Sequence, residues 1–113
     1  MAVTNRDIDK LRSYLQEWKG GAVSFNVFHD DHDRLILKLE HPTGLKPPVG
    51  LALFYCEYLA GPINWKGANL EPRIWTLKDG NAGLELRDEA AGFTVRCASA
   101  SLYGEPGITF PKS

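Results

Sequence analysis

Apolar and polar residues alternate in three short segments of the C-terminal half, and no other feature of the sequence constrains the fold as much. The alternating apolar residues are Trp75, Leu77, Leu84, Leu86, Phe93 and Val95. A period of two places such side chains on one face of β-strands, and the turn sequences between the segments join neighbouring strands. We therefore predict an antiparallel meander with strands at about 72–78, 82–88 and 92–98.

The turn chemistry predicts a register for this meander. A two-residue Gly80-Asn81 loop of type II′ places Trp75 opposite Leu86, with both side chains in the core. The same register puts Arg73 opposite Asp88 as a cross-strand ion pair. The other face of the meander is then polar and is expected to meet solvent; it carries Thr76, Lys78, Glu85, Arg87, Thr94 and Arg96.

A single amphipathic helix is predicted at about residues 4–19. Thr4 suits the N-cap position, and Asp7 three residues later completes a variant capping box. Gly20-Gly21 is expected to end the helix, because glycine readily adopts the left-handed backbone conformation of a helix C-terminus. The apolar stripe of the helix has spacings of three and four residues and consists of Ile8, Leu11, Leu15 and Trp18.

Three further strands precede the meander. Those at about 22–29 and 34–40 are expected to form a hairpin, whose face parity requires a loop of three residues, with Val27 opposite Leu35, or of five. The segment 49–59 is apolar on both parities, which is typical of a strand covered on both faces.

These elements predict a single α+β domain over residues 1–113, in which one N-terminal helix packs on a five- to six-stranded, mainly antiparallel meander sheet. The segment 61–70 is expected to be a loop. A C-terminal tail follows at 99–113, in which Ile108 and Phe110 can add a short edge strand.

Composition argues against several classes of protein. The formal net charge of −1 gives no general attraction to nucleic acid. The longest apolar run is interrupted by Glu57 and is too short to cross a bilayer, and the N-terminal residues show no secretory signal. Cys56 and Cys97 lie in apolar segments and are expected to be free thiols. We therefore expect a cytoplasmic protein that binds neither nucleic acid nor membrane and needs no cofactor.

The segment between the first two strands is rich in histidine and aspartate. Its imidazole and carboxylate groups are suitable metal ligands, and the candidates are His29, Asp31, His32 and Asp33. The spacing of these residues matches no established metal motif, however. The alternative is a polar turn, in which Asp31 and His32 are available to a binding partner.

Two aromatic clusters are the other candidates. Trp65, flanked by Asn64 and Lys66 in a polar segment, suits recognition of a partner, unless it folds back over the core. A second cluster could line a ligand pocket between sheet and helix; it consists of Tyr55, Glu57 and Tyr58.

The chain contains no nucleophile motif and no phosphate-binding loop. We therefore expect no catalysis and predict an interaction module that binds a protein partner, in an adaptor, inhibitor or immunity-like role. Two alternatives stay open: a small metal-dependent or acid–base enzyme that uses the His29–Asp33 cluster, and a small-ligand binder. A homodimer formed through an edge strand or a sheet face is equally open.

Overall fold

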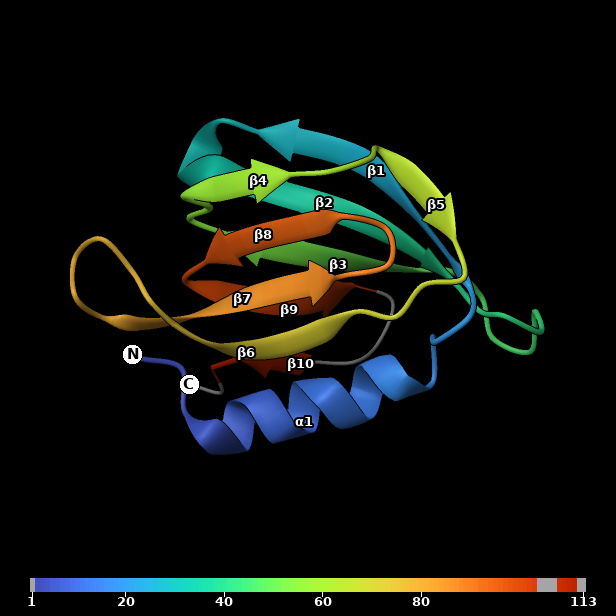
Figure 1. Ribbon diagram of the computed structural model, residues 1–113, viewed down its shortest axis with the longest axis horizontal. Coiled ribbons are helices and arrows are strands. Elements are labelled where there is room, and N and C mark those ends of the chain that lie inside the picture. Colours follow the sequence, from blue (N-terminus) through green and yellow to red (C-terminus); the bar gives the residue numbers. More distant parts are fainter. Residues whose placement is uncertain (1, 104–107, 112–113) are drawn as a thin grey trace.

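The computed structural model describes residues 2–103 and 108–111, which hold one α-helix, one turn of 3-10 helix and ten strands (Figure 1). All paired strands are antiparallel. The predicted α+β class with a mainly antiparallel sheet is confirmed. The strands form two sheets, however, where the sequence pattern led us to expect one.

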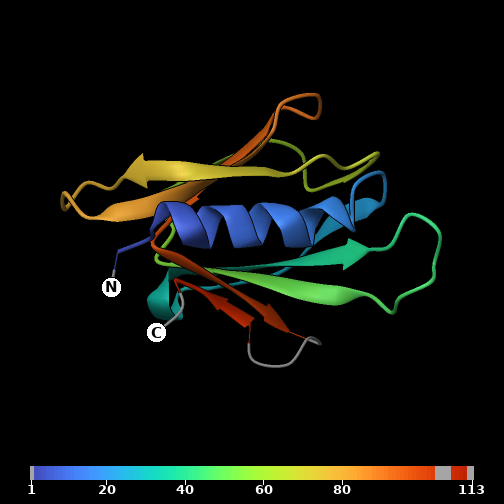
Figure 2. The same cartoon turned by 90° about the horizontal axis from the view of Figure 1, so that it is seen from below.

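The two sheets face each other as layers, with the helix along one open side between them (Figure 2). The six-stranded sheet has the order β10-β9-β3-β2-β1-β5 and consists of β1 (Ala22–His29), β2 (Arg34–Glu40), β3 (Val49–Phe54), β5 (Asn64–Lys66), β9 (Ser99–Tyr103) and β10 (Ile108–Phe110). The four-stranded sheet has the order β4-β8-β7-β6 and consists of β4 (Tyr58–Ala60), β6 (Glu71–Thr76), β7 (Ala82–Asp88) and β8 (Phe93–Cys97).

Helix α1 (Asn5–Gln16) begins as the sequence predicts. Asp7 N donates to the Thr4 hydroxyl at 3.2 Å, and Thr4 N donates to the Asp7 carboxylate at 2.9 Å, so the capping box is formed. The helix packs against β6 of one sheet and β10 of the other. The side chain of Leu11, in the middle of the helix, is fully buried. Trp18, just beyond the end of the helix, is also buried, as predicted. This helix is too short and too polar to cross a membrane, and the described residues hold no other candidate span.

The predicted strand 49–59 is divided between the two sheets. It bends at Tyr55, whose φ of 55° interrupts the extended backbone, and β3 therefore lies in one sheet and β4 in the other. Strands β8 and β9 change sheets beside it at Ala98, whose N–H donates to the carbonyl of Phe54 at 2.9 Å. The sequence does not mark this bend, because a non-glycine residue with positive φ is uncommon.

The register predicted between β6 and β7 is wrong. Trp75 pairs with Gly83 instead of Leu86, and Arg73 pairs with Glu85 instead of Asp88. The connecting turn is longer than two residues because the Asp79 carboxylate accepts a hydrogen bond from Asn81 N and stabilises a wider loop. A shift by an odd number of residues exchanges the faces of a strand, so Trp75 lies on the outer face and not in the core.

The third strand of the meander, β8, keeps the face that the alternation predicts. Leu86 pairs with Val95, and Phe93 lies opposite Asp88. Glu85, Arg87 and Arg96 therefore share the outer face of the four-stranded sheet, as the alternation predicts.

The first hairpin and the tail also differ in detail from the expectation. A bulge between Phe25 and Val27 places Val27 opposite Ile36 instead of Leu35. Strand β5 lies within the predicted loop 61–70, and β9 within the predicted tail. The edge strand expected from Ile108 and Phe110 is β10. Residues 104–107 and 112–113 of the tail lie outside the described residues.

Candidate functional site: the arginine face

The outer face of the four-stranded sheet carries a row of side chains that runs across all four strands. Arg73 on β6 pairs with Glu85 on β7, which pairs with Arg96 on β8, which in turn pairs with Tyr58 on β4. Trp75 and Arg87 lie beside this row on the same face. We call this surface the arginine face; it consists of Tyr58, Arg73, Trp75, Glu85, Arg87 and Arg96.

Glu85 is the centre of the arginine face, and its side chain is fully buried there. Its two carboxylate oxygens accept hydrogen bonds from Arg73 Nε at 2.6 Å and from Arg96 Nε at 2.8 Å. Arg87 Nε lies 4.0 Å from the same carboxylate. Burial raises the pKa of Glu85, but the hydrogen bonds and charges of the two arginines outweigh it, so the pKa of this carboxyl is lowered overall.

Two aromatic rings hold Arg96 in place. Its guanidinium carbon lies 3.9 Å from the centroid of the Trp75 ring and 4.5 Å from that of Tyr58. Trp75 sits opposite Gly83, which presents no side chain between the indole and the neighbouring strand. Ring contact and the bond to Glu85 together fix the guanidinium of Arg96 in one orientation.

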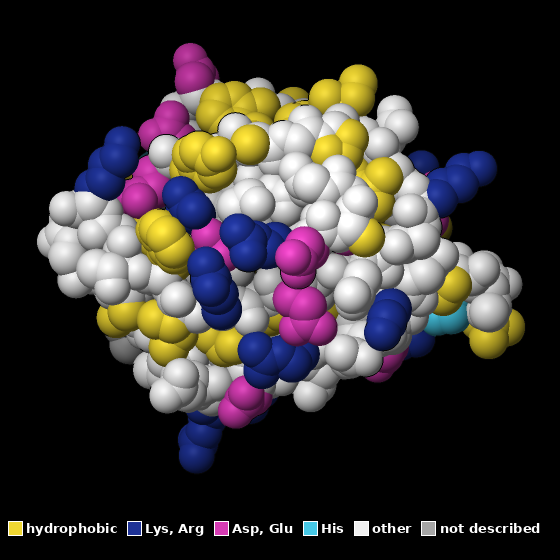
Figure 3. All heavy atoms as spheres, viewed as in Figure 1, with side chains coloured by type: hydrophobic (Ala, Val, Ile, Leu, Met, Phe, Trp, Pro, Cys, Tyr) yellow, Lys and Arg dark blue, Asp and Glu magenta, His cyan; other side chains and the backbone are white. Residues whose placement is uncertain are grey.

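The arginine face is open to solvent. Lys and Arg side chains gather near its centre, among acidic and apolar groups (Figure 3). Tyr58 is 46% exposed, and the side chains of Arg73 and Arg87 are 55% and 46% exposed. Arg73, Arg87 and Arg96 surround the carboxylate of Glu85, so these four side chains together carry a charge of +2, while Glu71, opposite Arg87 on the same face, is paired with Arg12. Such a surface can bind carboxylates of a flat, acidic partner.

The loop between β1 and β2 brings Asp31 and His32 next to Tyr55. The Tyr55 hydroxyl lies 3.0 Å from His32 Nδ1, and Asp31 lies 3.3 Å from His32 Nε2. This carboxylate–imidazole–phenol chain could relay a proton, but each of the three residues is more than half exposed, so water competes for the same hydrogen bonds. No pattern in the sequence predicts that Tyr55 lies beside these two residues.

The other candidate metal ligands do not complete a site. His29 is paired in β1 with Arg34, and the backbone carbonyl of Asp33 accepts from Cys56 N at 3.1 Å. No group of three or more His, Cys, Asp or Glu side chains in the described part of the chain is arranged to hold a metal ion.

Trp65 is half-buried and packs on the core. Its ring centroid lies 4.7 Å from that of Phe93, and its Nε1 donates to Asp88 Oδ2 at 2.7 Å. This packing is the arrangement expected if Trp65 folds back over the core. Asn64 and Lys66 flank it on β5 and are exposed.

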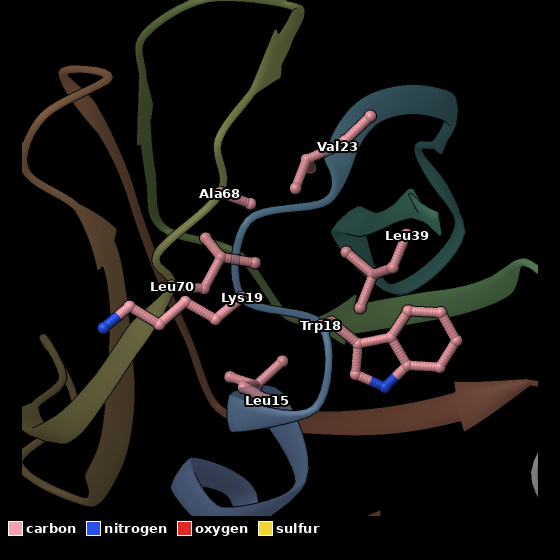
Figure 4. Close-up of a pocket in the computed structure, with 8 residues that line it drawn as sticks. Leu15, Trp18, Lys19, Val23, Leu39, Ala68 and Leu70 are labelled. Carbon is pink, nitrogen blue, oxygen red and sulfur yellow. The ribbon is translucent and has the colours of Figure 1, made fainter. Parts of the chain in front are cut away.

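The residues of the predicted ligand pocket lie at the bend between the sheets. Glu57 accepts a hydrogen bond from Lys78 N at 3.0 Å, while Tyr55 and Tyr58 are exposed. None of the three lines the cavity at the end of the helix (Figure 4), which is bounded by Leu15, Trp18, Lys19, Ala22, Val23, Leu39, Ala68 and Leu70. That cavity has a volume of about 10 Å³, which admits at most one water molecule.

Sequence reasoning placed Glu85, Arg87 and Arg96 on one face but treated that face as ordinary solvated surface. It missed Arg73 and Trp75, since the assumed register turned Trp75 inward. Only the observed register brings an arginine, a carboxylate, a second arginine and a tyrosine into one row.

Comparisons of this chain with known protein families, with curated proteins and with solved structures found no match.

Proposed function

We propose that this chain is a non-enzymatic interaction module that binds the acidic surface of a protein partner through the arginine face. The observation that carries the proposal is the Arg96 guanidinium, which is held between Trp75 and Tyr58 and bonded to the buried carboxylate of Glu85. Tryptophan, tyrosine and arginine are the residues most enriched among the energetic centres of protein interfaces.

The shape and charge of the arginine face support a protein partner over a small ligand. A flat sheet surface gives broad contact, whereas small molecules bind in concave pockets. The local charge of +2 stands out on a chain whose net charge is −1, so this surface favours an acidic partner. An adaptor, inhibitor or immunity-like role in the cytoplasm is consistent with such binding.

The test compares three forms of the protein as bait in cells of the source organism: wild type, Arg87→Ala and Lys38→Ala. Of the three arginines on the arginine face, Arg87 lies farthest from the Glu85 carboxylate. Its removal therefore leaves the two short hydrogen bonds of that carboxylate intact. Lys38 has similar exposure and lies on β2 of the other sheet, so it serves as the matched control. Thermal melting establishes that all three baits are folded.

We expect the wild-type and Lys38→Ala baits to capture the same partner protein and the Arg87→Ala bait not to capture it. With that protein purified, calorimetry should give a dissociation constant about tenfold weaker for Arg87→Ala, and wild-type binding should weaken as salt increases. Equal affinity of wild type and Arg87→Ala would refute the proposal. A captured nucleic acid, or self-association that accounts for the loss, would also refute it.

A further inference from the structure

The two cysteines of the chain meet at the bend where the strands change sheets. Cys56 lies between β3 and β4, and Cys97 is the last residue of β8. Their segments are hydrogen-bonded on both sides of this position: Glu57 N donates to the carbonyl of Arg96 at 2.8 Å, and Ala98 N donates to that of Phe54 at 2.9 Å. Cys56 and Cys97 therefore face each other across an antiparallel pair.

The registers on either side, Phe54 opposite Ser99 and Tyr58 opposite Arg96, leave three residues of one strand facing two of the other, so the two cysteines lie at a bulge. Opposed residues of an antiparallel pair have Cα atoms about 4.5 to 5.5 Å apart, and their side chains approach closely where they share a face. That spacing falls within the range over which disulfides form. Cys56 Sγ lies 3.4 Å from the carbonyl oxygen of Leu53 and Cys97 Sγ lies 3.5 Å from that of Ser99; the two thiols also interact with each other, and both are reduced.

The two thiols differ in access and in chemistry. Cys97 is fully buried, whereas Cys56 is half-buried. The hydrogen bond from Cys97 lowers the pKa of Cys56, with help from the backbone N–H of Leu35 and against the effects of burial and of the Asp33 charge. The same bond, together with burial, raises the pKa of Cys97. Cys56 is thus the attacking thiol, and Cys97 is the thiol that reacts second.

We propose that Cys56 and Cys97 form a redox-active dithiol, in which a peroxide oxidises Cys56 and Cys97 resolves the product to an intramolecular disulfide. In the first step the Cys56 sulfur attacks one peroxide oxygen, the O–O bond breaks, and Cys56 sulfenic acid and water are formed. In the second step the Cys97 sulfur attacks the sulfur of Cys56, the S–O bond breaks, and a second water leaves. The dithiol loses two electrons and two protons, and the peroxide is reduced to water.

The disulfide would link the two sheets at their bend. It closes a long loop between residues 56 and 97, and a constraint of this kind is expected to raise the melting temperature by about 10 °C. In a reducing compartment the dithiol is the resting form, and oxidation is transient.

The test treats fully reduced wild-type protein with hydrogen peroxide and then alkylates the remaining thiols under denaturing conditions. Mass spectrometry should show two alkylated thiols before treatment and none after it, with the unalkylated mass lower by about 2 Da for two lost hydrogen atoms. Dithiothreitol should restore both thiols. Gel filtration should show that the oxidised protein stays monomeric if the reduced protein is.

Two variants separate the roles of the cysteines. In Cys97→Ala, Cys56 should accumulate as a sulfenic acid that dimedone traps, whereas in Cys56→Ser the thiol of Cys97 should resist peroxide until the protein unfolds. The wild-type measurement stands even if a variant does not fold. Two alkylated thiols after peroxide, a disulfide between chains, or a mass gain of about 16 Da without a disulfide would each overturn the proposal.

Discussion

Gly21 shows how one residue can be essential for a reason that its neighbours in sequence do not reveal. The sequence predicts that Gly20-Gly21 ends the helix, but α1 already ends at Gln16, and Gly20 adopts its positive φ of 88° in the turn that follows. Gly21 matters for a different reason: a Cβ atom there would lie 1.9 Å from the backbone carbonyl oxygen of Glu40. The chain enters β1 against β2 at this point, and only glycine permits that approach.

We predict that Gly21→Ala lowers the free energy of unfolding by about 3 kcal/mol or more, because the backbone of β1 or β2 must move to admit the methyl group. Urea denaturation followed by circular dichroism measures the loss. Gly44→Ala is the matched control: Gly44 has a φ of 72° but open space around it, so only about 1 kcal/mol is expected. Equal losses in the two variants would show that the close approach to Glu40 is unimportant.

At the scale of elements, strands β6, β7 and β8 show what alternation alone can predict. The face predicted for Glu85, Arg87 and Arg96 is correct because the alternation that predicts it depends only on neighbours within each strand. The pairing of Trp75 is wrong because it depends on a loop whose length Asp79 alters by bonding to Asn81. The chemistry of the arginine face follows from the pairing, and so the sequence did not reveal it.

The arginine face gives a pH-dependent prediction. Since the folded-state pKa of Glu85 is below its ordinary value of 4.5, its contribution to stability is complete above that pH and is lost as the pH falls through the folded-state pKa. Glu85→Gln should therefore be less stable than wild type by about 2 kcal/mol at neutral pH. The difference should shrink in strong acid. Urea denaturation of both proteins between neutral pH and about pH 3 checks this, and a difference independent of pH would contradict it.

At the scale of the whole molecule, helix α1 covers the side where the two sheets would otherwise expose their shared core. It contacts β6 and β10, which are the edge strands of different sheets. Its apolar stripe could be predicted from spacing, but the two surfaces that it joins could not. The helix is thus a bridge between layers and not a cover over one sheet.

We predict that Leu11→Ala lowers the free energy of unfolding by about 3 kcal/mol, since Leu11 is fully buried and its loss leaves a cavity between helix and sheets. Lys10→Ala, one residue away on the exposed side of the helix, should change it by less than about 0.5 kcal/mol. The two variants are compared by urea denaturation. A small effect of Leu11→Ala would mean that the sheets form a stable core without the helix.

The sequence by itself determined the elements whose causes are local: the capping box of Thr4 and Asp7, the apolar stripe of the helix, and the inward parity of most strands. Tertiary structure alone decided how these elements meet. It divided the strands into two sheets at Tyr55 and Ala98, set the row from Arg73 to Tyr58, and brought Cys56 opposite Cys97. The reason is physical: alternation and capping act over a few residues, whereas register and layer depend on contacts between segments far apart in the chain.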